Sequence, residues 1–347
     1  MKKLFIPIIV ILIIAAGIGA FFVFQKPAFP DNKPVPKEIT TFEECIESGY
    51  PVMEFYPRQC KTSDGKTFTE KIIPVETQNN VNSVFNFVMI HFEVGAAERF
   101  PWYADIAKGS DTRNLKYQQA LWPTAIELVN LANKYNAKLT LAFTPQWAEY
   151  IMKDEKRVGI VREWQRQGHE IAYHHHGLDH PDWDGYSNRI EAKARAGYRG
   201  TAEEGFDFLR KLAYPESVSV GTITDTSVDI VDEIKVLTKG GAINDKGIDD
   251  LIDKPKNLVV GNKKFVILSH GFLETYYYND LNHEKTKAVI EQFKNKYEEA
   301  QNGDIVGIVT HGHDYYRYPS ALEEWLKFIQ SKNGTVEKIS DIVADIQ

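Results

Sequence analysis

The feature that most constrains this chain is a long alternation of short apolar runs with amphipathic stretches, from Val84 to Gln347. Short apolar runs bounded by turn residues predict strands, and the longer amphipathic stretches predict helices. The predicted strands are 84–91, 138–143, 170–175, 217–224, one or two within 257–270, 305–310 and 335–339. The predicted helices are 118–135, 146–166, 187–213, 228–237, 282–300 and 321–331, with a short helix at the end.

Repeated strand–helix units of this length are typical of an α/β fold with a parallel sheet. About seven such units fit a closed barrel better than a small open sheet. The sequence therefore predicts a distorted (β/α)7-type barrel over residues 84–347.

Most of the predicted strands end in side chains that can ligate a metal or transfer a proton. These residues are His91, His174, His176, Asp225, His270, His311 and His313. In an α/β barrel the loops at the carboxyl ends of the strands aim their side chains at one place. We therefore expect these groups to converge there.

The densest group lies in residues 169–183, which hold five of the ten histidines. Because side chains alternate along a strand, His174 and His176 point to one side and His175 to the other. His180 returns from the next loop, close to Asp179. Imidazole binds zinc and similar ions, and carboxylates join or orient such ligands. This pattern favours a divalent metal site over a polar loop with surface histidines.

Further strand ends supply candidate catalytic groups. His91 and Glu93 share one face of the first strand, where Glu93 can ligate a metal or act as a general base. His311 ends a buried strand and suits a general acid or a stabiliser of developing charge. His270 and His313 have similar settings, and for them a functional and a structural role are equally compatible with the sequence.

Aromatic residues on loops after the strand ends are candidates for binding sugar rings. Flat rings stack on sugar faces while hydroxyl groups form hydrogen bonds. The candidates are Trp183, Tyr276, Tyr278 and Tyr315. Capping of the apolar end of the barrel is the alternative role.

The N-terminus places the barrel outside the cytoplasm. An apolar run at 4–24 follows Lys2 and Lys3 and is about as long as the ~20 residues that cross a membrane. The preceding lysines favour a cytoplasmic N-terminus. A cleaved signal peptide, with small residues at 15–20, is the alternative, and it leads to a secreted protein.

Between this segment and the barrel we expect a proline-rich linker at 25–40, a small module at 41–75 and a polar linker at 76–83. The module contains the two cysteines of the chain, Cys45 and Cys60. An isolated pair outside the cytosol is typical of a disulfide, and a two-cysteine metal site is the minor alternative. The net charge of −7 excludes a basic nucleic-acid-binding surface over the chain as a whole.

Residues 168–174, Gly-His-Glu-Ile-Ala-Tyr-His, resemble the second motif of polysaccharide deacetylases of the carbohydrate esterase family 4 type. In that family a Gly-His-Glu-Ile strand leads to two metal-binding histidines. Residues 88–95 stand where its first strand carries Thr-Phe-Asp-Asp-Gly, and 307–311 resemble the final motif with the catalytic histidine. Residues 325–340 resemble the closing helix and strand, so that the resemblance spans about 84–347.

The resemblance implies a metal-dependent hydrolase that removes N-acetyl groups from a glycan. The implied metal is zinc, with cobalt, nickel or manganese as alternatives. The expected ligands are Glu93, His174 and His180, with His91 and His176 as substitutes or supporting residues. Asp179 or Glu93 would accept a proton from water, and His311 would protonate the departing amine.

Three motifs depart from the family pattern. Glu93 and Val94 replace the paired aspartates, and Val94 cannot bind metal. Leu178 stands where the family has its second histidine, and residues 219–225 replace the Arg-x-Pro-Tyr motif. These departures keep two alternatives open: a surface glycan-binding protein without catalysis, and a metal-dependent hydrolase of another ester bond.

Overall fold

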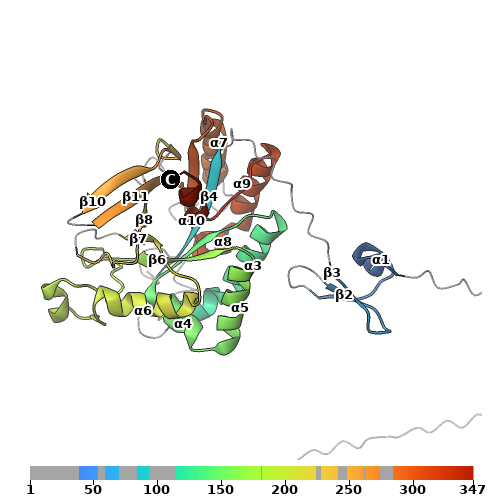
Figure 1. Ribbon diagram of the computed structural model, residues 1–347, viewed down its shortest axis with the longest axis horizontal. Helices are drawn as coiled ribbons and strands as arrows, with labels where there is room; N and C mark the ends of the chain where they lie inside the picture. The colour runs from blue at the N-terminus through green and yellow to red at the C-terminus, as the bar shows by residue number, and fades with distance from the viewer. Residues whose placement is uncertain are drawn as a thin grey trace, which may run out of the picture. The chain divides into compact units, whose positions relative to one another are not determined.

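The structure is a computed structural model, and it describes residues 39–53, 59–69, 84–93, 115–180, 182–223, 228–240, 248–260, 263–273 and 284–346 (Figure 1). The chain divides into two compact units, Met1–Ile72 and Ile73–Gln347. The predicted membrane segment at 1–24, almost all of the linker at 25–40 and the linker at 76–83 lie outside the described residues. Within the described residues, no helix combines the length and the apolar character needed to cross a membrane.

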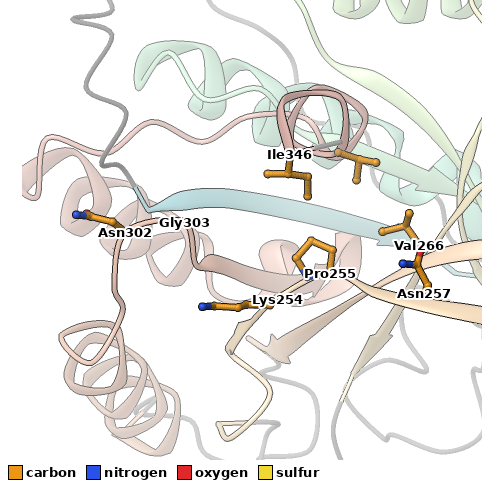
Figure 2. Close-up of a pocket in the computed structure, with 8 residues that line it drawn as sticks. Lys254, Pro255, Asn257, Val266, Asn302, Gly303 and Ile346 are labelled. Atoms are coloured by element: carbon orange, nitrogen blue, oxygen red, sulfur yellow. The ribbon is translucent and has the colours of Figure 1, made fainter.

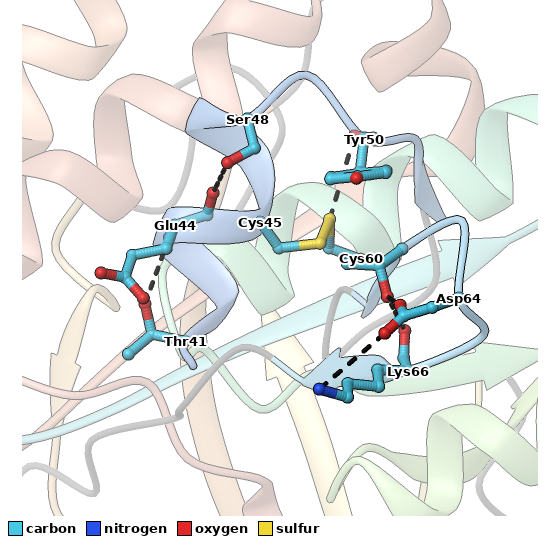
Figure 3. Close-up of a disulfide and its surroundings, with 9 residues drawn as sticks. Thr41, Glu44, Cys45, Ser48, Tyr50, Cys60, Asp64 and Lys66 are labelled. Carbon is cyan, nitrogen blue, oxygen red and sulfur yellow. Dashed lines mark hydrogen bonds and ion pairs between the residues drawn. A yellow bond between two sulfur atoms is a disulfide. The ribbon is translucent and has the colours of Figure 1, made fainter. Parts of the chain in front are cut away.

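The first unit is a small module with a disulfide at its centre. Helix α1 (Phe42–Glu47) is followed by a three-stranded antiparallel sheet of β1 (Val52–Met53), β2 (Gln59–Lys61) and β3 (Thr67–Thr69). Cys45 and Cys60 form the predicted disulfide and are buried with Phe42 (Figure 3). The Thr41 side chain caps α1 by accepting the Glu44 N–H. The bond encloses a loop with a sequence separation of 15, which stabilises the folded module by about 3 kcal/mol.

The second unit contains a closed parallel barrel of seven strands, as predicted. In order around the barrel they are β4 (Phe85–Phe92), β5 (Thr140–Phe143), β6 (Glu170–His175), β7 (Val220–Ile223), β8 (Val236–Gly240), β11 (Lys263–Phe272) and β12 (Ile305–His311). β12 pairs with both β11 and β4, and this closes the ring. Two antiparallel strands, β9 (Ile252–Asp253) and β10 (Lys256–Val260), extend from β12 and β11.

Helices surround the strands (Figure 1) and bury their apolar faces against them. They are α3 (Lys116–Lys134), α4 (Pro145–Met152), α5 (Glu155–Arg166), α6 (Ala202–Ala213), α7 (Glu284–Tyr297), α8 (Gly312–Arg317), α9 (Pro319–Ser331) and α10 (Ile339–Ile346), with a 3-10 helix η1 at Ile190–Ala194.

Four predicted elements differ from the structure. The helix predicted at 146–166 is two helices, because the Asp154 side chain caps a new one at α5. The stretch 187–213 contains η1 and α6 with a break between them. The helix predicted at 228–237 is wrong: Ile230, Val231 and Ile234 are buried without helical structure, and β8 begins at Val236. The predicted strand at 335–339 is reduced to one bridge, between Asn86 and Val336.

The barrel interior is packed with side chains and is closed at its amino end by α10. Ile339, Ile342 and Val343 of α10 pack with interior residues of the strands. At the start of α10, the Ile339 N–H donates to Thr140 Oγ1 and the Ser340 N–H to Glu170 Oε1. The strand residues are large enough that Gly307 is required, since a Cβ there would lie 2.1 Å from the Phe87 ring.

A cavity of about 360 Å³ also lies at this amino end (Figure 2). Pro255, Val266 and Ile346 provide apolar walls, and Lys254 lies at the side of the cavity. The strand-end histidines lie at the opposite end of the same strands. This cavity is therefore separate from the candidate metal centre described next.

Candidate metal centre

Six buried histidines gather at the carboxyl end of the barrel strands. This histidine cluster consists of His91 on β4, His174 on β6, His176 directly after it, His270 on β11, His311 on β12 and His313 on α8. The ring of His91 stacks on that of His174 with centroids 4.2 Å apart, and it lies 5.3 Å from His311 and 6.4 Å from His270. The structure thus brings together every predicted strand-end residue that it describes, and Asp225 lies outside the described residues.

The carboxylate of Glu93 lies at the centre of this cluster. Its Oε1 is 3.1 Å from Nε2 of His174 and 3.1 Å from Nε2 of His311, and its Oε2 is 2.9 Å from Nε2 of His176. Burial by itself raises the pKa of a carboxyl group, but His176 and His174 outweigh it and hold the pKa of Glu93 well below its ordinary value. Glu93 is therefore ionised at neutral pH.

An unprotonated imidazole nitrogen and a carboxylate oxygen both carry lone pairs and repel each other. Each of these contacts therefore requires a cation or a proton between the two atoms. In His176, Nδ1 donates to the Asp182 carbonyl O at 2.9 Å, so a neutral ring presents a bare Nε2 to Glu93. Burial lowers the pKa of His174 despite the nearby carboxylate, which favours its neutral, metal-binding form. One divalent ion would serve the rings of His174 and His176, and a proton on Nε2 would serve His311.

The spacing of the donor atoms fits such an ion. Zn–N bonds of ~2.0–2.1 Å in a tetrahedral site place neighbouring donor atoms about 3.3 Å apart, close to the distances around Glu93. His91, Glu93 and His174 offer donor atoms within 4.8 Å of one another. In addition, Nε2 of His91 and Nδ1 of His174 are buried without a hydrogen-bond partner among the described residues. The residues present therefore fit a first-row divalent metal.

His311 is oriented by a carboxylate that the sequence analysis did not assign a role. Its Nδ1 lies 2.9 Å from Asp314 Oδ2, while its Nε2 faces Glu93. Burial disfavours the charged ring, but Asp314 and Glu93 outweigh it and raise the pKa of His311 to about 10. His311, His313 and Asp314 form a second group of possible ligands, in which His313 Nδ1 lies 3.2 Å from the Tyr117 hydroxyl. The sequence feature that could have indicated this role is the position of Asp314, three residues after His311.

A second buried network lies on the other side of β6. His175 Nδ1 is 2.8 Å from Asp184 Oδ2 and its Nε2 is 3.3 Å from Asp229 Oδ2. All three side chains have an exposed fraction of 0%. The sequence placed His175 opposite His174 and His176, but it gave no signal for the two aspartates, because Asp184 comes from the following loop and Asp229 from a distant segment.

Of the other predicted site residues, Asp179 is exposed, His180 contacts the histidine cluster and His270 belongs to it. The centroid of the His180 ring lies 4.0 Å from that of His176, and its Nδ1 accepts the Asp182 N–H. Asp179 is 70% exposed and pairs with Arg189 at the surface. His270 Nδ1 lies 3.3 Å from the Gly271 carbonyl O.

The predicted aromatic residues are only partly described. The Trp183 Nε1–H donates to the Tyr186 carbonyl O, and the side chain is partly buried. Tyr315 is buried in the core that joins the helices and the strands, which agrees with the alternative capping role. Tyr276 and Tyr278 lie outside the described residues, and their role stays a prediction.

Comparison of the sequence with family models and with curated proteins gives no match. Solved structures do match the fold. A probable polysaccharide deacetylase from Pseudomonas aeruginosa aligns with a TM-score of 0.50 and 16% identity, covering 76% of this chain and 90% of the other. The barrel has the fold of the polysaccharide deacetylases.

Other deacetylase-fold structures align less well. The polysaccharide deacetylase Bc1974 from Bacillus cereus aligns with a TM-score of 0.38, 13% identity and coverage of 74% and 92%. A family 4 acetyl xylan esterase from Clostridium thermocellum, solved with a cobalt ion, aligns with a TM-score of 0.39, 14% identity and coverage of 75% and 90%. Because one fold hosts many reactions, the function rests on the site.

Proposed function

We propose that this protein is a metal-dependent hydrolase that removes N-acetyl groups from a polysaccharide outside the cytoplasm. The observation that carries the proposal is the Glu93 carboxylate, which faces the Nε2 atoms of three buried histidines at the carboxyl end of the barrel. The polysaccharide deacetylase fold of the barrel supports the substrate class.

Glu93, His174 and His176 would hold the metal, with His91 close by. The contact of His180 with the ring of His176 suits a supporting role rather than the ligand role predicted for it. Zinc fits a set of two imidazoles and a carboxylate, and cobalt, nickel or manganese fit it as well. When bound, such an ion polarises an amide carbonyl and lowers the pKa of water towards ~7.

The side chains of the site divide the proton transfers between them. His311, whose pKa is raised to about 10, carries a proton at neutral pH and is oriented by Asp314. It can therefore donate that proton to the departing amine. Glu93 is ionised and is the carboxylate in place to accept a proton, whereas Asp179 is held at the surface by Arg189.

The location outside the cytoplasm is supported by two features. The apolar segment at 4–24 would anchor the chain in the membrane with its N-terminus in the cytoplasm, or would direct secretion if cleaved. The disulfide between Cys45 and Cys60 is typical of an oxidising compartment.

The test combines elemental analysis of the purified protein with acetate release from N-acetylglucosamine oligomers in added Zn²⁺ or Co²⁺. We expect about one metal ion per chain, and acetate release that is abolished by chelation and by His174→Ala. His169→Ala is the control, because His169 is buried at the opposite end of β6 and binds Asn133 and the Leu139 N–H.

Bound metal without acetate release would overturn the proposed deacetylase activity. Ester substrates would then be tested next. Absence of bound metal in the folded wild type would overturn the proposed enzymatic activity. The glycan-binding alternative would then remain, which is favoured by Val94 in place of an aspartate.

A further inference from the structure

His175 lies between the two β6 histidines that contact Glu93, but it faces the other way. Successive side chains on a strand alternate, so that His174 and His176 face Glu93 while His175 faces outward. There it lies between Asp184 and Asp229. We call these three residues the His175 clamp.

The clamp joins three segments of the chain. Besides His175, Asp184 accepts the N–H groups of His176 at 3.2 Å and of Tyr186 at 3.0 Å. Asp229 accepts the Asn188 N–H at 2.6 Å and the Ser187 hydroxyl at 3.2 Å. The end of β6, the loop at 182–188 and the segment at 228–229 are thereby held together.

The same loop fixes the orientation of His176. The Asp184 N–H donates to the His176 carbonyl O at 3.2 Å, and the His176 N–H donates to the Asp184 side chain. The Asp182 carbonyl O accepts a hydrogen bond from His176 Nδ1–H, which leaves Nε2 directed at Glu93. Both the backbone and the ring of His176 are therefore held by residues 182–184.

We propose that His175 is a positioning residue, whose contacts with Asp184 and Asp229 hold His174 and His176 in place for metal binding. This inference rests on the proposed function. Metal ligands are effective only within a few tenths of an ångström of their required positions, and residues behind the ligands typically change metal affinity by ~10–100-fold. Asp184 of the clamp hydrogen-bonds to the backbone N–H and carbonyl O of His176, so the clamp acts through the backbone of β6 and its loop.

The test is a titration of the full-length protein with Co²⁺, followed by visible absorption, which reports ligand geometry as well as affinity. His175→Gln retains one donor group and breaks the clamp. We expect a Kd for Co²⁺ about tenfold or more above that of the wild type, and a changed spectrum. His169→Gln is the matched control: it makes the same change in another buried, hydrogen-bonded histidine of the same region and should leave both readouts unchanged.

Wild-type Kd and spectrum in folded His175→Gln would overturn the inference. If that variant does not fold, Asp229→Ala decides, since it removes the contact of Oδ2 with His175 Nε2. A weaker Kd with a changed spectrum in Asp229→Ala supports the clamp, and wild-type behaviour overturns it. Failure of the wild type to bind Co²⁺ would instead overturn the proposed function itself.

Discussion

Glu93 carries a half-buried negative charge that faces three imidazole rings. Glu93→Gln keeps the shape of the side chain but removes the charge and directs an amide NH2 group at a histidine. We expect this variant to lose more metal affinity than the ~10–100-fold typical of residues behind the ligands. Equilibrium dialysis against Zn²⁺ measures the metal affinity of the wild type and of this variant.

Glu170→Gln provides the comparison, because Glu170 is also a half-buried carboxylate of the barrel but lies at the amino end, where it accepts hydrogen bonds from Thr140 and Ser340. Its Zn²⁺ affinity should equal that of the wild type. Retention of full affinity in Glu93→Gln would show that the metal is held elsewhere.

The pKa of His175 predicts that the free energy of unfolding depends on pH. Burial lowers the pKa of this ring, but Asp184 and Asp229 outweigh it and raise the pKa to about 9, above its ordinary 6.5. The stabilisation is therefore complete below about pH 6.5 and is lost as the pH rises through about 9. The shift corresponds to a contribution of about 3 kcal/mol to the free energy of unfolding.

Asp229→Asn removes one of the two charges, so the pKa of His175 in the folded state falls. We expect the free energy of unfolding to differ most between wild type and variant below about pH 6.5, and the difference to narrow towards about pH 9. Urea unfolding of both proteins between about pH 6.5 and 9, with a chelator present to remove metal, measures this difference in free energy. A difference that does not vary with pH would contradict the role of His175.

At the level of elements, continuous apolar runs revealed the barrel strands because parallel strands are buried on both faces. The helix predicted at 228–237 was wrong because its apolar residues recur at helical spacing, while the structure buries Ile230, Val231 and Ile234 without a helix.

The convergence of Glu93, His174 and His311 could be predicted, because the carboxyl ends of barrel strands meet at one place. The partners of His175 could not be predicted, since Asp184 and Asp229 meet it only through tertiary structure.

At the level of the whole molecule, the two compact units have different sources of stability. In Met1–Ile72 the buried core among the described residues is Phe42, Cys45 and Cys60, so the module depends on its disulfide. The barrel unit has two extensive apolar clusters of its own. Large cores support independent folding, whereas small modules require a cross-link.

The double variant Cys45→Ser/Cys60→Ser should therefore lose about 3 kcal/mol in the module and leave the barrel intact. Limited proteolysis with mass spectrometry should show new cleavage within residues 39–69, while calorimetry and Co²⁺ titration show an unchanged barrel transition and Kd. Dithiothreitol should reproduce this in the wild type and have no effect on the double variant. A lowered barrel transition in both cases would mean that the barrel draws stability from the module, contrary to its separate core.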